Sequence, residues 1–257
     1  MQFTSDADIG ELLQSLPTRI ESILSTRLVG VYLYGSLVTG DFERGSSDID
    51  LLVVTSADID DGEFARLDAM HGEVSSQYRE WEGRIEIAYA SSEALKTYRT
   101  RASRIAVISP GEPFHFKEAG KDWLMNWYVV REKGVALFGL PPQDVIDPIT
   151  RDEFVEAVRE NTRDWGAWLR HMTGRKGQAY AILTMCRALH LIKTGEQASK
   201  RAAAMWASKA LPEWSSLIEN ALLWREVWRS DEGVDHAATF PETERFVNFM
   251  IGQIVDG

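Results

Sequence analysis

Two stretches decide the fold of the first half: Leu28-Val-Gly-Val-Tyr-Leu-Tyr-Gly-Ser36 and, after a polar connection, Ser47-Asp-Ile-Asp-Leu-Leu-Val-Val54. The first is rich in β-forming residues and reaches Gly35, which predicts a buried strand that ends at a sharp turn. The second predicts another buried strand. Because side chains alternate between the faces of a strand, Asp48 and Asp50 are expected to point to the same side.

A pair of carboxylates on one side of a strand can hold a hard divalent cation. Magnesium prefers oxygen ligands and usually takes one or two carboxylates together with substrate phosphates. The sequence therefore predicts a Mg2+ site at Asp48 and Asp50, which a nucleotide triphosphate completes.

A third carboxylate, Glu86, lies between Ile85 and Ile87 on the next expected strand. An ionisable group there interrupts apolar alternation, which indicates an inner-face or rim position near the aspartates. Glu86 is expected either to accept a proton as general base or to help ligate a metal ion, and the sequence does not separate these roles.

Phosphate ligands are expected close to this site. Gly35 and Ser36 follow a strand and precede an expected short helix, whose N-terminal N–H groups suit phosphate oxygens. Ser47 offers a hydroxyl directly before Asp48. No Gly-x-x-x-x-Gly-Lys-Ser/Thr phosphate loop is present in the sequence.

The periodicity of apolar residues predicts an organisation in two parts. The first is an α/β (α+β) domain over 1–145 with a small sheet, and the second is an all-α helical bundle over 146–257. Expected strands cover 28–34, 48–55, 84–89 and 104–109; expected helices cover 8–26, 60–81, 150–172, 178–194, 199–210, 212–229 and 241–255. The segment 110–116 is expected to form a turn.

Composition limits the environment and the partners. The chain has 257 residues, a formal net charge of −11 and a single cysteine, Cys186, which excludes an internal disulfide. No apolar run is long enough to cross a bilayer and the N-terminus is acidic, so a cytoplasmic protein without a membrane partner is expected. The negative charge disfavours nucleic acid and favours a cationic small molecule. The oligomeric state is not readable, and a monomer is the default expectation.

The motifs Tyr34-Gly-Ser-Leu-Val-Thr-Gly40 and Ser47-Asp-Ile-Asp-Leu-Leu-Val-Val54 resemble those of the streptomycin and spectinomycin adenylyltransferases, in the nucleotidyltransferase superfamily with the DNA polymerase β-like fold. The resemblance implies a small mixed sheet followed by a helical domain that completes the ATP and acceptor cleft. Leu183-Thr-Met-Cys-Arg187 and Ser199-Lys200 resemble the segment whose arginine and lysine contact the nucleotide phosphates. It implies that Arg187 and Lys200 bind ATP.

The function that this resemblance implies is magnesium-dependent transfer of AMP from ATP to a hydroxyl of an aminoglycoside, with release of pyrophosphate and antibiotic resistance as the role. Gly177 and Tyr180 stand where the drug-binding aspartate and histidine of the family are expected. Trp123, Trp127 and Tyr180 are the candidate acceptor contacts. The alternatives are a nucleotidyltransferase acting on a protein, tRNA or another small hydroxyl acceptor, and a non-enzymatic nucleotide-binding module.

An acidic row on the first helix of the second part is open to two interpretations. Asp152, Glu156, Glu160 and Asp164 recur every four residues on one face. Such a row is usually a solvated surface, and the alternative is an acidic wall for a cationic acceptor.

Overall fold

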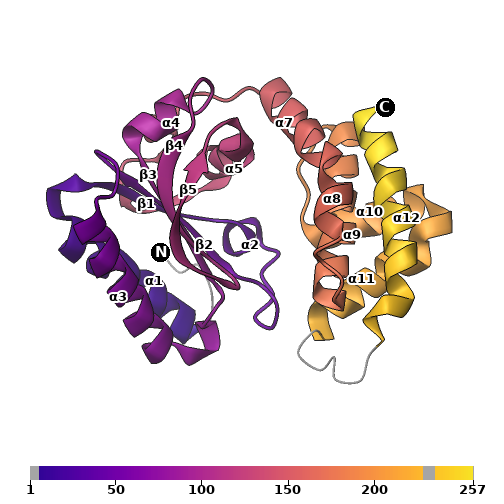
Figure 1. Ribbon diagram of the computed structural model, residues 1–257, viewed down its shortest axis with the longest axis horizontal. Helices are drawn as coiled ribbons and strands as arrows, with labels where there is room; N and C mark the ends of the chain where they lie inside the picture. Colours follow the sequence, from indigo (N-terminus) through magenta and orange to yellow (C-terminus); the bar gives the residue numbers. More distant parts are fainter. Residues whose placement is uncertain (1–5, 228–234, 257) are drawn as a thin grey trace. The chain divides into compact units, whose positions relative to one another are not determined.

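The computed structural model describes residues 6–227 and 235–256. The chain forms two compact units, Met1–Thr150 and Arg151–Gly257, called unit 1 and unit 2 below (Figure 1). The boundary predicted from the sequence falls at 145/146.

Unit 1 is built on a mixed sheet, as predicted, and the sheet has six strands where four were expected. The strand order is β5-β4-β3-β2-β1-β6, in which β2 and β3 are parallel and the other neighbours are antiparallel. The strands are β1 (Leu28–Tyr34), β2 (Ile49–Thr55), β3 (Ile85–Ser91), β4 (Ser103–Ser109), β5 (Glu112–Ala119) and β6 (Val135–Gly139).

Helices cover both faces of this sheet (Figure 1). The long helices α1 (Ala7–Leu24) and α3 (Asp61–Gln77) pack side by side on one face, over a core that includes Leu33, Leu51 and Ile87. Helix α5 (Leu124–Lys133) lies against β1 on the other face. The short helices are η1 (Ser25–Arg27), α2 (Ser36–Thr39), η2 (Arg79–Trp81), α4 (Ser92–Thr97), η3 (Lys121–Trp123) and α6 (Pro142–Val145).

The structure corrects the sequence prediction at the edges of the sheet. The segment 110–116 is not only a turn, because residues from Glu112 onward form β5, which pairs with β4 through a turn at Gly111. Pro113 cannot donate to a ladder, and it is tolerated because β5 is an edge strand. Helix α5 and the other edge strand, β6, were not predicted.

Unit 2 is all-helical in its described residues, as predicted. Helix α9 (Arg175–Thr194) packs against α10 (Lys200–Ala210), α11 (Ser215–Val227) and α12 (His236–Val255). The other elements are α7 (Arg151–Arg163), α8 (Trp165–Leu169) and η4 (Pro212–Trp214). Cys186 is fully buried on α9, and burial raises the pKa of its thiol to about 12.

Helix ends in unit 2 follow local capping chemistry. Gly195 closes α9 with a φ of +72°, and the Ser199 hydroxyl caps α10 by accepting from the Ala202 amide at 3.1 Å. The predicted helix over 150–172 is divided into α7 and α8. The last helix begins before Pro241, because Asp235 caps it. The predicted positions 228–229 lie outside the described residues.

No helix in the described part of the chain is both long and apolar enough to cross a membrane.

Candidate active site

Three side chains form a row across the central strands of unit 1. Asp50 on β2 is paired with Glu86 on β3 in the parallel register and with Tyr34 on β1 in the antiparallel register. Neighbouring strands lie roughly 4.8 Å apart, and residues opposite one another share a face. The row therefore lies on the face opposite α1 and α3, at the C-terminal end of β1 and the N-terminal ends of β2 and β3.

The turn after β1 is shaped to the carboxylate of Asp50. Gly35 has a φ of +73°, and a β-carbon at this position would collide with Asp50 Oδ2. The backbone thus passes directly against the carboxylate, and a glycine is required for both reasons. Helix α2 starts at the next residue, Ser36, which is half-buried.

Asp48 lies one residue before β2, in the connection from α2, and is half-buried. The preceding Ser47 is only 4% exposed, and its Oγ accepts a hydrogen bond from the Glu43 amide at 2.9 Å. This contact gives the Ser47 hydroxyl a role in shaping the connection. Its contact with phosphate stays a prediction.

The row combines two carboxylates with a buried phenol. Burial raises the pKa of Tyr34 well above its usual range, and the charges of Asp50 and Glu86 raise it further, so its phenol stays neutral. Two carboxylates directly opposite each other on neighbouring strands repel, and a bound cation relieves that repulsion.

Magnesium needs more oxygen ligands than the carboxylates of this site provide. The described residues contain no group of three or more His, Cys, Asp or Glu side chains arranged to hold a metal. An ion that takes one or two carboxylates from this site needs further oxygens, and the phosphates of a nucleotide are such oxygens.

Unit 2 carries the two predicted phosphate-binding cations. Arg187 is exposed on α9, on the same helical face as Tyr180, two turns away. Lys200 is the first residue of α10, and its Nζ lies 5.0 Å from the centroid of the Tyr180 ring. Within unit 2, the fold thus brings Lys200 to a predicted acceptor contact 20 positions earlier in the sequence.

Comparisons with known proteins match both units. A nucleotidyltransferase domain model matches residues 15–96, and a model of the aminoglycoside adenylyltransferase C-terminal domain matches residues 144–253. The chain is 26% identical over 261 residues to an aminoglycoside (3'') (9) adenylyltransferase of Escherichia coli, covering 96% of this chain and 95% of that one. The chain belongs to the aminoglycoside adenylyltransferase family.

A more distant relative and a solved structure also match most of the chain. A spectinomycin 9-adenylyltransferase of Staphylococcus aureus is 22% identical, with 91% of each chain covered. The crystal structure of a spectinomycin adenyltransferase from Enterococcus, with ATP and spectinomycin, aligns with a TM-score of 0.74 at 18% identity, over 95% of this chain and 98% of that one. The protein is a nucleotidyltransferase enzyme of the aminoglycoside adenylyltransferase kind, which removes the non-enzymatic alternative.

The tryptophans near the boundary between the units fall into two pairs, one in each unit. Trp123 and Trp127 lie in unit 1 with ring centroids 5.2 Å apart, and they are only 7% and 2% exposed. This burial favours a role in the core and gives no support to their predicted contact with an acceptor. Trp165 and Trp168 lie on α8 of unit 2.

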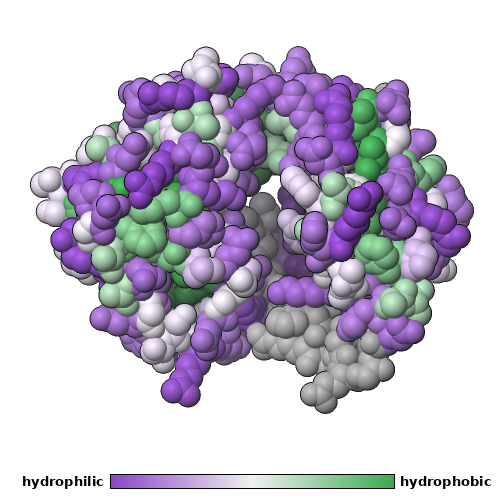
Figure 2. Space-filling view, viewed as in Figure 1, coloured by the Kyte–Doolittle hydropathy of each residue, from purple (hydrophilic) through white to green (hydrophobic). Residues whose placement is uncertain are grey.

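An exposed aromatic surface on unit 2 was only partly predicted. Tyr180 and Trp168 are 46% and 41% exposed, and each ring centroid lies 5.7 Å from that of buried Trp165. On the face seen in Figure 2, hydrophilic residues surround small groups of hydrophobic ones. Apolar spacing signalled only that these aromatics lie on helices, because it does not distinguish an exposed ring from a core ring.

The acidic row on α7, with Asp164 directly after this helix, is largely exposed. Asp152, Glu156 and Asp164 are exposed, and Glu156 lies 4.0 Å from both Arg159 and Arg163. Such exposed ion pairs contribute little to stability. The described contacts therefore support the surface interpretation rather than an acidic wall.

Proposed function

We propose that this nucleotidyltransferase moves an adenylyl group from ATP to a hydroxyl of an aminoglycoside, with Mg2+ held by Asp48 and Asp50. The single observation that carries the proposal is the row in which Asp50 and Glu86 stand opposite each other beside the turn at Gly35. A protein places two carboxylates there at a cost in stability, and such a conflict is typical of a functional site.

The bond that forms joins the acceptor oxygen to the α-phosphorus of ATP, and the bond that breaks joins that phosphorus to the pyrophosphate. Glu86 accepts the proton of the attacking hydroxyl as general base, or helps to ligate metal instead. Bound Mg2+ would supply neutralisation of the phosphate charge. Positioning and charge neutralisation provide most of the catalysis in such reactions.

The nucleotide contacts that we assign come from both units. In unit 1 they are Gly35 and Ser36 at the start of α2, with Ser47 in the connection. In unit 2 they are Arg187 and Lys200, whose charges would stabilise the leaving pyrophosphate. Support for the second pair comes from the family match over residues 144–253 and from the exposure of Arg187.

The acceptor is assigned from charge and from relatives. The net charge of −11 attracts a polycation and repels tRNA over roughly a Debye length, about 8 Å at physiological salt. Relatives of similar length are aminoglycoside or spectinomycin adenylyltransferases. We assign Tyr180 as an acceptor contact because its exposed ring offers a stacking face beside Lys200.

Pyrophosphate release tests this proposal. The protein would be incubated with ATP, Mg2+ and one drug at a time from a panel that includes streptomycin, spectinomycin and hygromycin-like aminoglycosides. We expect release with at least one drug, abolished in Asp48→Ala and retained in Glu118→Ala, which removes an exposed carboxylate from edge strand β5. Retention of ATP binding without release for any drug would contradict the aminoglycoside acceptor and move the proposal to another hydroxyl compound.

A further inference from the structure

The connection between α2 and β2, residues 40–48, carries part of the proposed site but has no regular secondary structure. Its internal bonds form a compact turn around Glu43, whose carbonyl oxygen accepts from the amides of Ser46 at 3.0 Å and Ser47 at 2.8 Å. These bonds give the turn its shape. They do not fix the turn against the sheet, and Asp48 depends on that placement.

Arg84 makes backbone contacts that link the connection to the sheet. This residue directly precedes β3 and is only 5% exposed. Its Nη2 donates to the carbonyl oxygen of Arg44 at 2.7 Å and to that of Ser47. Its own carbonyl oxygen accepts from the Ile49 amide at 2.9 Å. Arg84 therefore holds the chain on both sides of Asp48.

A buried ring supports the Arg84 side chain. The guanidinium carbon lies 4.4 Å from the centroid of Trp81, which is 1% exposed. The indole Nε1 donates to Asp8 Oδ2 at 3.1 Å, and Asp8 receives two bonds from Arg44 at 3.0 and 2.8 Å. The side chain of Arg44 is thus anchored through Asp8 to the ring on which Arg84 stacks.

We propose that Arg84 is a positioning residue of the transferase, which sets the distance between Asp48 and the β3 carboxylate Glu86. The proposal deepens the proposed function and rests on it. A guanidinium suits this task because its planar fork donates to several carbonyls and stacks on a ring, whereas a lysine ammonium does neither in the same geometry. A displacement of about 1 Å at a catalytic group can lower a rate by roughly 100-fold.

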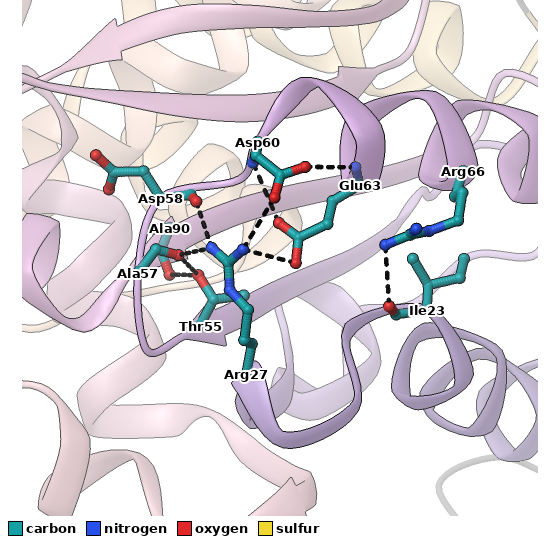
Figure 3. Close-up of polar contacts among 9 residues, drawn as sticks. All are labelled: Ile23, Arg27, Thr55, Ala57, Asp58, Asp60, Glu63, Arg66 and Ala90. Carbon is teal, nitrogen blue, oxygen red and sulfur yellow. Dashed lines mark hydrogen bonds and ion pairs between the residues drawn. The ribbon is translucent and has the colours of Figure 1, made fainter.

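Arg27 offers a matched control at the other end of β2 (Figure 3). Its Nη2 donates to the carbonyl oxygens of Ala57, at 3.2 Å, and Asp58, and its Nη1 forms ion pairs with Asp60 at 3.2 Å and Glu63 at 2.8 Å. Like Arg84, Arg27 donates to backbone carbonyls of a connection, here the one that follows β2. This connection carries no residue of the proposed site. Comparing variants of Arg84 and Arg27 therefore separates a loss of fold stability from a loss of site geometry.

The experiment compares Arg84→Met, Arg84→Lys and Arg27→Met in the full chain. The readouts are thermal unfolding, hydrogen exchange over residues 41–50, Mg2+-dependent ATP binding without acceptor, and turnover. For Arg84→Met we expect faster exchange over 41–50, a roughly tenfold higher Mg2+ concentration for half-maximal ATP binding, and turnover lowered roughly 10- to 100-fold. Each of these three readouts for Arg84→Lys should lie between the value for Arg84→Met and that for the wild type. Arg27→Met should lower the unfolding temperature while leaving exchange at 41–50, the Mg2+ requirement and turnover within about twofold of the wild type.

The proposal is overturned if Arg84→Met loses stability like Arg27→Met but keeps the wild-type Mg2+ requirement and the wild-type hydrogen exchange over residues 41–50. If Arg84→Met does not fold, the same criterion applies to Arg84→Lys. Failure of the proposed function looks different. In that case the wild type itself transfers nothing to any drug, while Mg2+-dependent ATP binding and exchange still report on Arg84.

Discussion

The proposed site residues of the two units differ in charge and in the elements that carry them. Unit 1 offers carboxylates on strands, and unit 2 offers cations on helices. In unit 1, Asp50 and Glu86 stand side by side on neighbouring strands, where the ladder fixes their separation. In unit 2, Arg187 and Lys200 lie on separate helices, and Arg187 is exposed. The ladder sets the spacing of residues on neighbouring strands, whereas long side chains on helices keep many rotamers. The contrast favours unit 1 for the proposed chemical step and unit 2 for the proposed phosphate contacts.

The largest expected effect comes from neutralising the carboxylate at the centre of the row. Asp50→Asn keeps the shape of the side chain against Gly35 but removes a charge that the cation needs. We expect turnover to fall by roughly 1,000-fold or more, since loss of metal binding removes several kcal/mol of transition-state stabilisation. Steady-state kinetics with saturating Mg2+ measures this, with Glu118→Gln as the control. Near-normal turnover would show that unit 1 does not hold the catalytic metal.

Glu86→Gln separates proton transfer from binding. A general base contributes roughly 100- to 10,000-fold, so turnover should fall by that factor while ATP binding changes little. Comparison of kcat with the dissociation constant for MgATP, measured by calorimetry, tests this expectation. A large loss of MgATP affinity with modest loss of kcat would instead make Glu86 chiefly a metal ligand.

Removing a cation from unit 2 should affect binding more than chemistry. A hydrogen bond to a charged group is worth about 1.5–3 kcal/mol, so Lys200→Ala and Arg187→Ala should each raise the KM for ATP by roughly 10- to 150-fold. Lys193→Ala, which removes an exposed charge near the end of α9, is the control. If kcat fell with an unchanged KM for ATP, the division of roles between the units would be wrong.

The smallest expected effect is on the acceptor. Tyr180→Ala removes an exposed ring that contacts Trp165 and Lys200, and stacking on such a ring is worth about 0.5–1.5 kcal/mol. The KM for the drug should rise roughly 2- to 10-fold while Tyr180→Phe stays close to the wild type. An unchanged drug KM in the alanine variant would remove Tyr180 from the acceptor contacts.

The centre of the fold was predictable from local pattern, and its edges were not. Strands β1, β2 and β3 are buried and β-rich, so their sequences show where they lie. Strand β5 carries Pro113 and alternates weakly, so turn signals dominated its prediction. The pairing of Asp50 with Glu86 required the parallel register of two strands that are separated by α3, and such a contact has no local signal.

The same reasoning applies to the site. The two aspartates were visible because their spacing matches the period of a strand, and Glu86 was visible because it interrupts apolar residues. Arg84 gave no signal, since a charged residue before a strand is ordinarily on the surface, and here it is buried against Trp81. Trp123 and Trp127 show the opposite case, because a tryptophan near a boundary suggested a ligand contact and the fold buries both side chains, which does not support that prediction. Arg187 and Lys200 were found through family resemblance alone.

The most direct test of the central claim follows the α-phosphate. The wild-type protein and Asp50→Asn would be incubated with Mg2+, an aminoglycoside and ATP labelled either at the α- or at the γ-phosphate, and the drug would then be isolated. Adenylyl transfer predicts label on the drug only from α-labelled ATP and only with the wild type. Label from γ-labelled ATP would indicate phosphoryl transfer, and unlabelled drugs across the panel would contradict the proposed acceptor class.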